Sequence, residues 1–271
     1  MRVRDPRARL KTGDRVEVHL QERGAAPVVP PALEANRLLH LDGEVVLVDK
    51  PAGVLAQEGR AGGPDLASLV SALLAARGEA SLALLVHRLD RGTTGACVLA
   101  RTRAAQALLL QAFRDGLVAK EYLALCAGTG EADPAAVEFT VDLALGADPA
   151  ATGRRRSDPA GEPARTRVQV LRRWPATSAA GAHALVAAFP ETGRTHQVRV
   201  HLAARGLPLL GDVRYGGPRL VTGPSGARLD VARPLLHAKR LQLPPLAPSA
   251  PSLSVEAPVP ADLAAAIAFL G

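Results

Sequence analysis

Short apolar runs separated by polar turns dominate this chain from residue 44 onward. Their length and their β-branched content are typical of strands, and the glycine, proline and aspartate residues between them are typical of turns. The predicted strands cover residues 45–48, 96–100, 121–127, 137–143, 166–171, 184–189, 235–241 and 252–255. Because most of these runs follow one another with no helix between them, we expect a mixed, largely antiparallel sheet.

Apolar residues with helical spacing occur in only a few segments. One segment covers residues 66–74, and a second runs from Thr102, a typical N-cap residue, to Asp115, with Gly116 as its stop signal. Two more helices are expected over residues 195–204 and 261–269. A few helices among many strands predict an α+β fold with helices flanking the central sheet.

Three segments lie outside this pattern. Residues 10–18 form a turn followed by an alternating strand, and the stretch over residues 21–31, rich in proline and alanine, is typical of a linker. Residues 146–162, which include three consecutive arginines, are expected to form a solvated surface loop, with RNA contact as the alternative.

The net charge points weakly to a polyanionic partner. The chain has 33 basic and 26 acidic residues, a formal net charge of +7, and nearly all of its cations are arginines. The planar guanidinium group suits bidentate contact with phosphate, so RNA is a compatible partner. A GC-rich genome would produce the same arginine content, so charge alone does not assign RNA binding.

Cys97 and Cys126 lie in strand-like apolar runs, which predicts reduced cysteines in the core of a cytoplasmic protein. No apolar span is long enough for a membrane helix, and the first residues do not lead into the apolar core of a signal peptide. We therefore expect a cytoplasmic protein with no membrane partner.

The most informative segment is HRLDRGTTG at residues 87–95, directly after an apolar run. It places Asp90 between Arg88 and Arg91. Because nearby cations favour the carboxylate, Asp90 is expected to be ionised and to serve as a nucleophile or base. An aspartate flanked by arginines is also a common surface ion pair, so this segment alone leaves both interpretations open.

A second segment, ETGRTHQVRVH, follows at residues 191–201. With both segments present, the chain resembles the RluA-type pseudouridine synthases, whose signature segments are similar to HRLD-x-x-[ST]-[ST]-G and TGRTHQ-[IV]-R-x-H. Shorter matches occur in the family's order: VDKPAG at residues 48–53, KEYLA at 120–124 and LHA at 236–238. The resemblance covers nearly all of the chain beyond the first forty residues, and it implies a pseudouridine synthase fold with a catalytic cleft. Thr94 stands where serine is commoner in the family, which keeps the hydroxyl.

The resemblance implies an isomerase that detaches uracil from ribose and rejoins it through carbon, with no cofactor and no metal. It makes Asp90 the essential catalytic residue. Tyr122 takes the place of the active-site tyrosine, which can stack on the uracil and transfer a proton, and an interior strand tyrosine is the alternative. Arg194 is expected to pair with Asp90 and keep it charged, and a structural ion pair is the alternative.

Other positions are candidates for binding the RNA. The resemblance implies that Arg88 fills the space left by the flipped nucleotide, with a phosphate contact as the alternative. Arg91 is a further candidate for RNA contact. Val198 and Leu236 are candidates for an apolar wall of the cleft, although hydrophobic residues are expected there in any core.

The histidines do not have metal-ligand spacing. His196 and His201 are five residues apart, which on a helix turns them about 140° from each other, whereas a helical two-histidine site needs a spacing of four. We therefore predict no metal site. His87 and His237 are expected to pack or to form hydrogen bonds around the cleft.

The expected domain organisation has three parts. Residues 1–20 look like the remnant of a small RNA-binding domain, named after a ribosomal small-subunit protein, that precedes the catalytic domain in many relatives. A misassigned start site and a decayed module are both compatible with this remnant. Residues 21–33 form the linker, and residues 34–271 form the catalytic domain.

The sequence therefore predicts an RNA pseudouridine synthase, monomeric, that acts on structured RNA. The domain remnant favours ribosomal RNA, and transfer RNA is the alternative. A non-catalytic RNA-binding or ribosome-assembly factor on the same fold would be expected to have lost Asp90, Tyr122 or Arg194, and all three are present. A nucleotide-hydrolysing enzyme would need a glycine-rich phosphate loop, which the sequence lacks.

Overall fold

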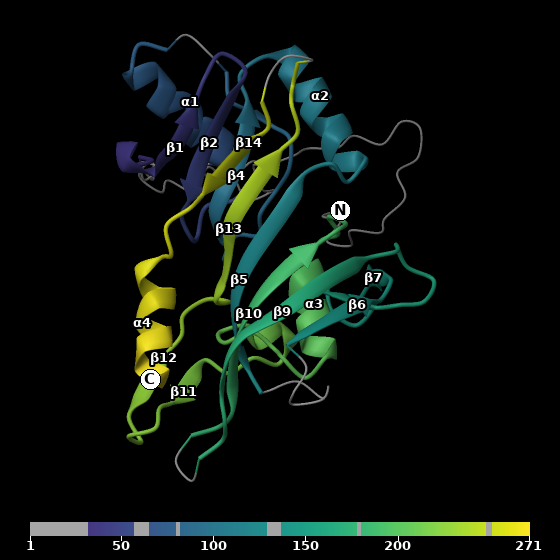
Figure 1. Ribbon diagram of the computed structural model, residues 1–271, viewed down its shortest axis with the longest axis vertical. Helices are drawn as coiled ribbons and strands as arrows, with labels where there is room; N and C mark the ends of the chain where they lie inside the picture. Colours follow the sequence, from purple (N-terminus) through teal and green to yellow (C-terminus); the bar gives the residue numbers. More distant parts are fainter. Residues whose placement is uncertain (1–31, 57–64, 80–81, 129–136, 178–179, 248–250) are drawn as a thin grey trace, which may run out of the picture.

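The computed structural model describes residues 32–56, 65–79, 82–128, 137–177, 180–247 and 251–271. A ten-stranded sheet crosses the whole molecule in the order β1-β2-β4-β13-β5-β10-β9-β6, with β14 beside β13 and β3 beside β4 (Figure 1). Its strands are β1 (Leu38–Leu41), β2 (Val45–Lys50), β3 (Leu84–Leu85), β4 (Thr94–Ala100), β5 (Ala119–Ala127), β6 (Glu138–Asp142), β9 (Arg165–Trp174), β10 (His183–Pro190), β13 (Leu236–Leu243) and β14 (Leu253–Glu256). The described strand pairs are antiparallel apart from β4 and β13, which confirms the predicted mixed sheet.

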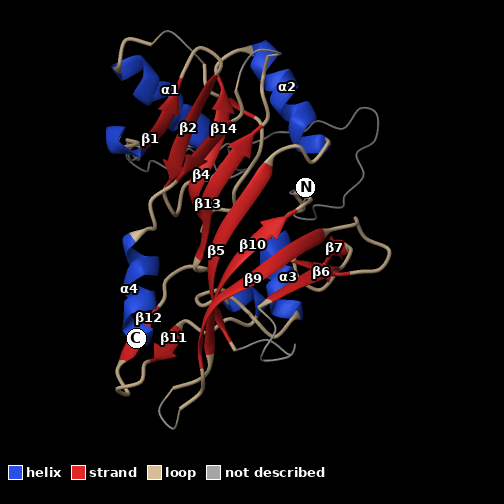
Figure 2. Cartoon of the chain, viewed as in Figure 1, coloured by secondary structure: helices blue, strands red, loops and turns tan. Residues whose placement is uncertain are grey.

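The helices flank the sheet as predicted (Figure 2). They are α1 (Leu66–Ala76), α2 (Arg103–Arg114), α3 (Gln197–Ala204) and α4 (Ala261–Leu270), together with short 3-10 turns η1 (Ala35–Arg37) and η2 (Val213–Tyr215). Thr102 caps α2 as expected, because its side chain accepts the N–H of Ala105 at 3.0 Å. Helix α3 begins two residues later than the sequence predicts, at Gln197.

The central strands are buried on both faces. Along β2, Val45 and Leu47 belong to the core under α2, whereas Val46 and Val48 belong to the core under α1. In the other half of the sheet, α3 and α4 each cover a separate apolar cluster, and Leu125 of β5 packs in the cluster under α4. Burial on both faces explains why these strands are continuous apolar runs in the sequence rather than alternating ones. Both cysteines are buried and free, in agreement with the prediction.

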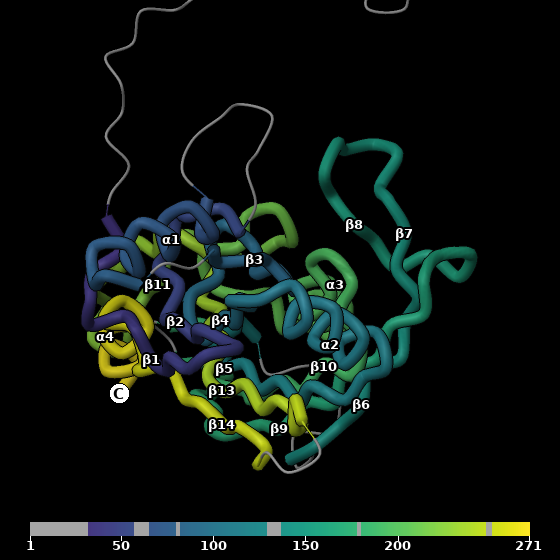
Figure 3. The backbone as a smooth tube through the Cα atoms, turned by 90° about the horizontal axis from the view of Figure 1, so that it is seen from above, coloured from purple at the N-terminus to yellow at the C-terminus, as the bar shows by residue number. Residues whose placement is uncertain are grey.

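Residues 146–162 are not the irregular loop that the sequence predicts. They contain most of a hairpin formed by β7 (Leu145–Ala147) and β8 (Arg155–Ser157), which projects from the body of the molecule (Figure 3). A second unpredicted hairpin pairs β11 (Leu220–Thr222) with β12 (Arg228–Asp230). Both are made of three-residue strands with one buried residue per hairpin, Leu145 and Val221, so neither produces a hydrophobic pattern.

The N-terminal predictions fall mostly on residues outside the described ranges. This applies to the strand over residues 10–18 and to all but the end of the linker. Leu33, assigned to the linker, is buried in the core cluster that α1 covers. None of the described helices is long and apolar enough to cross a membrane.

Candidate active site

A cleft of about 660 Å³ lies where the loop after β3 meets β5, β13 and the start of α3. Asp90 of that loop, Tyr122 of β5 and Leu236 of β13 all line it. Its volume lies within the range of roughly 300–1,000 Å³ that is usual for small-molecule sites. The two segments singled out in the sequence therefore meet in one cavity, about a hundred residues apart in the chain.

Two cations hold the loop after β3 in place. The side chain of Lys50 is fully buried, and its Nζ donates to the carbonyl of Arg91 at 3.3 Å and to that of Thr93 at 2.9 Å. Nη1 of Arg233 donates to the carbonyl between them, that of Gly92, at 3.0 Å. Three consecutive carbonyls are thus bound by charged donors, which fixes the position of the aspartate immediately before them.

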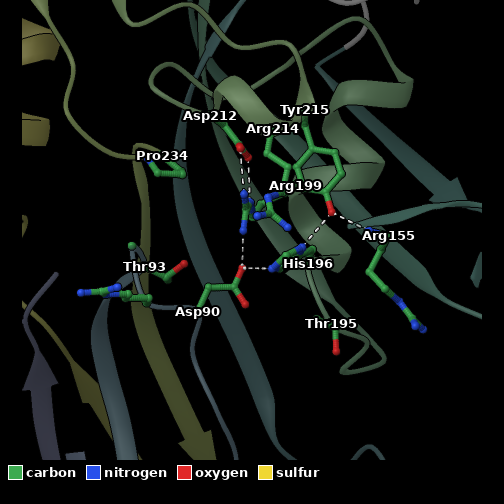
Figure 4. Close-up of polar contacts among 12 residues, drawn as sticks. Asp90, Thr93, Arg155, Thr195, His196, Arg199, Asp212, Arg214, Tyr215 and Pro234 are labelled. Carbon is green, nitrogen blue, oxygen red and sulfur yellow. Dashed lines mark hydrogen bonds and ion pairs between the residues drawn. The ribbon is translucent and has the colours of Figure 1, made fainter. Parts of the chain in front are cut away.

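The carboxylate of Asp90 is bound by Arg199 of α3 (Figure 4). Nη1 of Arg199 donates to Oδ2 of Asp90 at 3.0 Å, while its Nε and Nη2 bind the two oxygens of Asp212 at 2.7 and 2.8 Å. Burial alone would lower the pKa of Arg199, but its hydrogen bonds and charge interactions with the two carboxylates raise that pKa. A permanently charged guanidinium therefore bridges a buried acid and the acid in the cleft.

His196 and Tyr215 form a second contact beside this bridge. Nε2 of His196 lies 3.8 Å from Oδ2 of Asp90, and its Nδ1 lies 2.7 Å from Oη of Tyr215. Burial lowers the pKa of His196, and the nearby Arg199 and Arg214 lower it further against the opposing effect of Asp90. The imidazole is therefore neutral at neutral pH.

Tyr122 is the aromatic residue that β5 contributes to the cleft. Burial raises the pKa of its phenol, and the charge of Asp90 raises it further. The side chain therefore keeps its proton at neutral pH, so it can donate a proton or a hydrogen bond but cannot serve as a phenolate base.

A sequence model of the family described as RNA pseudouridylate synthase matches residues 44–204, which is more than half of the chain. The chain belongs to this family. It is therefore an isomerase of the RluA type, as its motifs predict.

Curated relatives and solved structures agree with this assignment. The uncharacterized RNA pseudouridine synthase YhcT of Bacillus subtilis is 36% identical to this synthase over 258 residues, covering 94% of this chain and 78% of that protein. The ribosomal large subunit pseudouridine synthase D of Nitrosomonas europaea is 36% identical over 232 residues, covering 84% of this chain and 63% of that protein. The structure of human RNA pseudouridylate synthase domain containing 4 matches with a TM-score of 0.64 and 26% identity, covering 87% of this chain and 93% of that one.

The synthase does not pair Arg194 with Asp90, so that prediction is wrong. Nη1 of Arg194 binds Glu162 at 2.9 Å and its Nε donates to the carbonyl of Pro163 at 3.2 Å, although the residue still lines the cleft. Arg199, five residues later, takes the predicted place. Arg194 precedes the turn into α3, whereas Arg199 lies within the helix that faces the cleft.

The arginines that flank Asp90 in the sequence do not pair with it either. Arg88 lines the cleft and donates to the hydroxyl of Thr195. Nε of Arg91 donates to the carbonyl of Gly53 at 3.0 Å, and the residue is absent from the cleft lining in the described part of the chain. The arginine that pairs with Asp90 is therefore Arg199 rather than either of its sequence neighbours.

The remaining predicted residues are near the cleft. Val198 and Leu236 are both buried and both line it. Nε2 of His87 accepts the N–H of Val98 at 3.1 Å, and its ring stacks on Phe113. Nδ1 of His237 lies 2.9 Å from the hydroxyl of Thr94.

Sequence reasoning missed Arg199, Asp212 and Tyr215 as site residues. Arg199 stands inside the quoted second motif, but spacing alone does not distinguish it from Arg194. Asp212 and Tyr215 follow α3 and are brought back to the cleft by the turn at η2. Within the described residues, no group of three histidine, cysteine or acidic side chains is placed to hold a metal ion.

Proposed function

We propose that this synthase isomerises specific uridines of ribosomal RNA, with Asp90 acting on the ribose of a nucleotide flipped into the cleft. The observation that carries the proposal is the geometry of Asp90. Its carboxylate lies in the cleft, and a permanently charged arginine binds one of its oxygens. A carboxylate held in this way is oriented for use as a nucleophile or base.

The surrounding residues suit the chemistry of the exchange. Asp90 breaks the bond between C1′ and N1, either by attack on C1′ or by removal of a ribose proton. The freed uracil rotates and its C5 bonds to C1′, which displaces the Asp90 carboxylate in the first route and is completed by return of the ribose proton in the second. The released carboxylate of Asp90 can then accept the proton that leaves C5. The neutral phenol of Tyr122 lines the cleft, and we propose that it stacks on the base and takes part in proton transfer as a donor. Val198 and Leu236 provide an apolar wall that limits access of water.

Binding of a phosphate backbone is supported by the cations around the cleft. Arg88, Arg114, Lys120 and Arg194 line it, against a single acidic residue besides Asp90, Glu191. We propose that Arg88 enters the base stack where the flipped uridine was, because its side chain is exposed at the cleft. Relatives named ribosomal large subunit pseudouridine synthase D favour ribosomal over transfer RNA as the target.

The assignment of Asp90 is tested by Asp90→Asn. The side chain keeps its shape and loses its charge, so single-turnover isomerisation should be abolished while RNA binding stays within about tenfold. Asp230→Asn makes the same charge change on the exposed strand β12, away from the cleft, and should react like the wild type. Turnover of even a few per cent in Asp90→Asn would refute the assignment.

The RNA target is tested separately by mapping pseudouridine in total RNA from a deletion strain and its parent. Loss of sites in ribosomal RNA alone would support the proposed target. Loss in transfer RNA would replace it with the alternative substrate. Unchanged maps, together with retained RNA binding, would favour a non-catalytic binding factor.

A further inference from the structure

His196 has a backbone conformation that side chains rarely adopt. Its φ of 58° and ψ of 17° place it in the left-handed region, and it is the only residue other than glycine with positive φ in the described part of the chain. This turn immediately precedes α3. It directs the imidazole toward Asp90 and Tyr215, as Figure 4 shows. A rare conformation that aims a side chain at a catalytic group suggests a role for that side chain.

The partners of Tyr215 determine which ring nitrogen of His196 carries the proton. Oη of Tyr215 accepts the backbone N–H of Arg155 at 2.9 Å, and a backbone amide can only donate. Burial raises the pKa of Tyr215, so the phenol keeps its own proton. The acceptor in reach is Nδ1 of His196, at 2.7 Å. In a neutral ring with an unprotonated Nδ1, the proton is on Nε2.

The opposite tautomer fits the surroundings poorly. It would direct the lone pair of Nε2 at a carboxylate oxygen of Asp90 3.8 Å away. It would also leave the phenol proton of Tyr215 without an acceptor among the described residues. The neutral ring with the proton on Nε2 avoids both problems, because it places a donor opposite the carboxylate.

We propose that His196 is a positioning residue that, with Arg199, holds Oδ2 of Asp90 and leaves Oδ1 as the oxygen that reacts with the ribose. The inference rests on the proposed role of Asp90. Arg199 and His196 both face Oδ2, at 3.0 and 3.8 Å. No group of the described residues is bonded to Oδ1, which Figure 4 shows pointing away from both partners. The contact from His196 is longer than a hydrogen bond, and we expect it to shorten when RNA fills the cleft.

The tautomer is tested directly by nitrogen NMR of the histidine rings in the full chain. The His196 signals are assigned by their loss in His196→Gln. We expect a protonated Nε2 and an unprotonated Nδ1 at pH 7.5. In Tyr215→Phe, which removes only the hydroxyl, we expect a mixture of both neutral tautomers. Asp230→Asn alters an exposed ion pair with Arg219 on β12, away from Tyr215 and the cleft, and should keep the wild-type pattern. A protonated Nδ1 in the wild type would overturn the proposal.

The role of the Nε2–H donor of His196 is tested by comparing His196→Gln with His196→Ala. Both lose the ring, but only glutamine keeps an N–H that reaches about as far as Nε2. With total RNA from the deletion strain as substrate, the alanine variant should lose on the order of ten- to a hundredfold in single-turnover rate. The glutamine variant should stay within about fivefold of the wild type, and both should bind RNA normally.

These experiments distinguish a failure of the His196 proposal from a failure of the Asp90 proposal. Equal rates in the glutamine and alanine variants would show that the donor has no role and would overturn the assignment of His196. An active Asp90→Asn protein would refute the proposed function instead. The NMR result does not depend on turnover, so a failure of the catalytic assignment cannot be mistaken for a failure of the tautomer.

Discussion

At the scale of single residues, Lys50 places a buried cation next to the loop that carries Asp90. Its Nζ donates to three backbone carbonyls. Burial lowers the pKa of Lys50 from 10.5 to about 8. Between these two values the unfolded chain binds a proton that the folded chain has released. The contribution of this residue to the free energy of unfolding therefore rises as the pH increases through that window.

Lys50→Met tests this linkage, because methionine has similar length and does not titrate. The free energy of unfolding of the wild type minus that of the variant should increase between pH 8 and 10.5, by up to about 3 kcal/mol. Urea unfolding of both proteins at several pH values measures this difference. A difference that stays constant from pH 7 to 10.5 would show that the lysine is not perturbed.

Tyr122→Phe isolates the hydroxyl of the cleft tyrosine. The ring that stacks is kept, so RNA affinity should stay within about threefold of the wild type. The single-turnover rate should fall on the order of a hundredfold if the phenol takes part in proton transfer. An unchanged rate would restrict Tyr122 to stacking.

Which arginine pairs with Asp90 could not be predicted from the sequence. Arg194 and Arg199 are both arginines of one motif, and either spacing is compatible with pairing. The choice depends on the left-handed turn at His196, which starts α3 at Gln197 and places Arg199 in its buried first turn, within reach of Asp90. Backbone conformation at a non-glycine residue has no reliable signal in a single sequence.

At the scale of elements, Gly95 allows β4 and β13 to approach each other. Gly95 pairs with Ala238 in the parallel ladder between these strands. The φ angle of Gly95 is 110°, which residues other than glycine rarely adopt. A Cβ atom added there would lie 2.2 Å from the carbonyl oxygen of Ala238, which is a backbone atom and cannot move freely. This contact joins the strand after the Asp90 loop to the strand that carries Leu236.

Gly95→Ala should therefore destabilise the protein by at least about 3 kcal/mol, because the clash and the unfavourable φ add. Gly43→Ala is the matched control, since a Cβ there meets nothing within 4 Å and should change stability by less than about 0.5 kcal/mol. Urea unfolding of the three proteins measures both effects. Similar stability in the two variants would contradict the packing argument.

Elements were predictable where they bury apolar residues. The longer core strands and the four helices each gave a hydrophobic run or a helical spacing, and α2 also gave its cap. Six short strands among the described residues were not predicted: β1, β3, β7, β8, β11 and β12. Each has only two to four residues, which is too short for a hydrophobic pattern to stand out in the sequence. The proximity of Asp90 to α3 depends on the order of the strands in the sheet. Hydrophobic periodicity along the sequence does not reveal that order.

At the scale of the whole molecule, the cleft lies across one hydrogen-bonded sheet rather than between two domains. One wall is attached to β4 and the other to β10, and β13 and β5 lie between them as hydrogen-bonded neighbours in the same sheet. The apolar clusters of both halves pack against these same strands. Tyr122 belongs to the margins of two of these clusters, so the base of the cleft is part of the core.

We expect this continuity to keep the two walls of the cleft at a fixed separation. Rotating one wall away from the other would break strand pairs between β4, β13, β5 and β10, so we expect the change that brings uridine into contact with Asp90 to occur in the RNA. A paired uridine then has to unstack at an energetic cost of a few kcal/mol before it reacts. In matched RNA hairpins, a uridine in the loop should be isomerised at least about tenfold faster than the same uridine in the stem. Single-turnover rates that are equal for the two positions would mean that the protein itself opens.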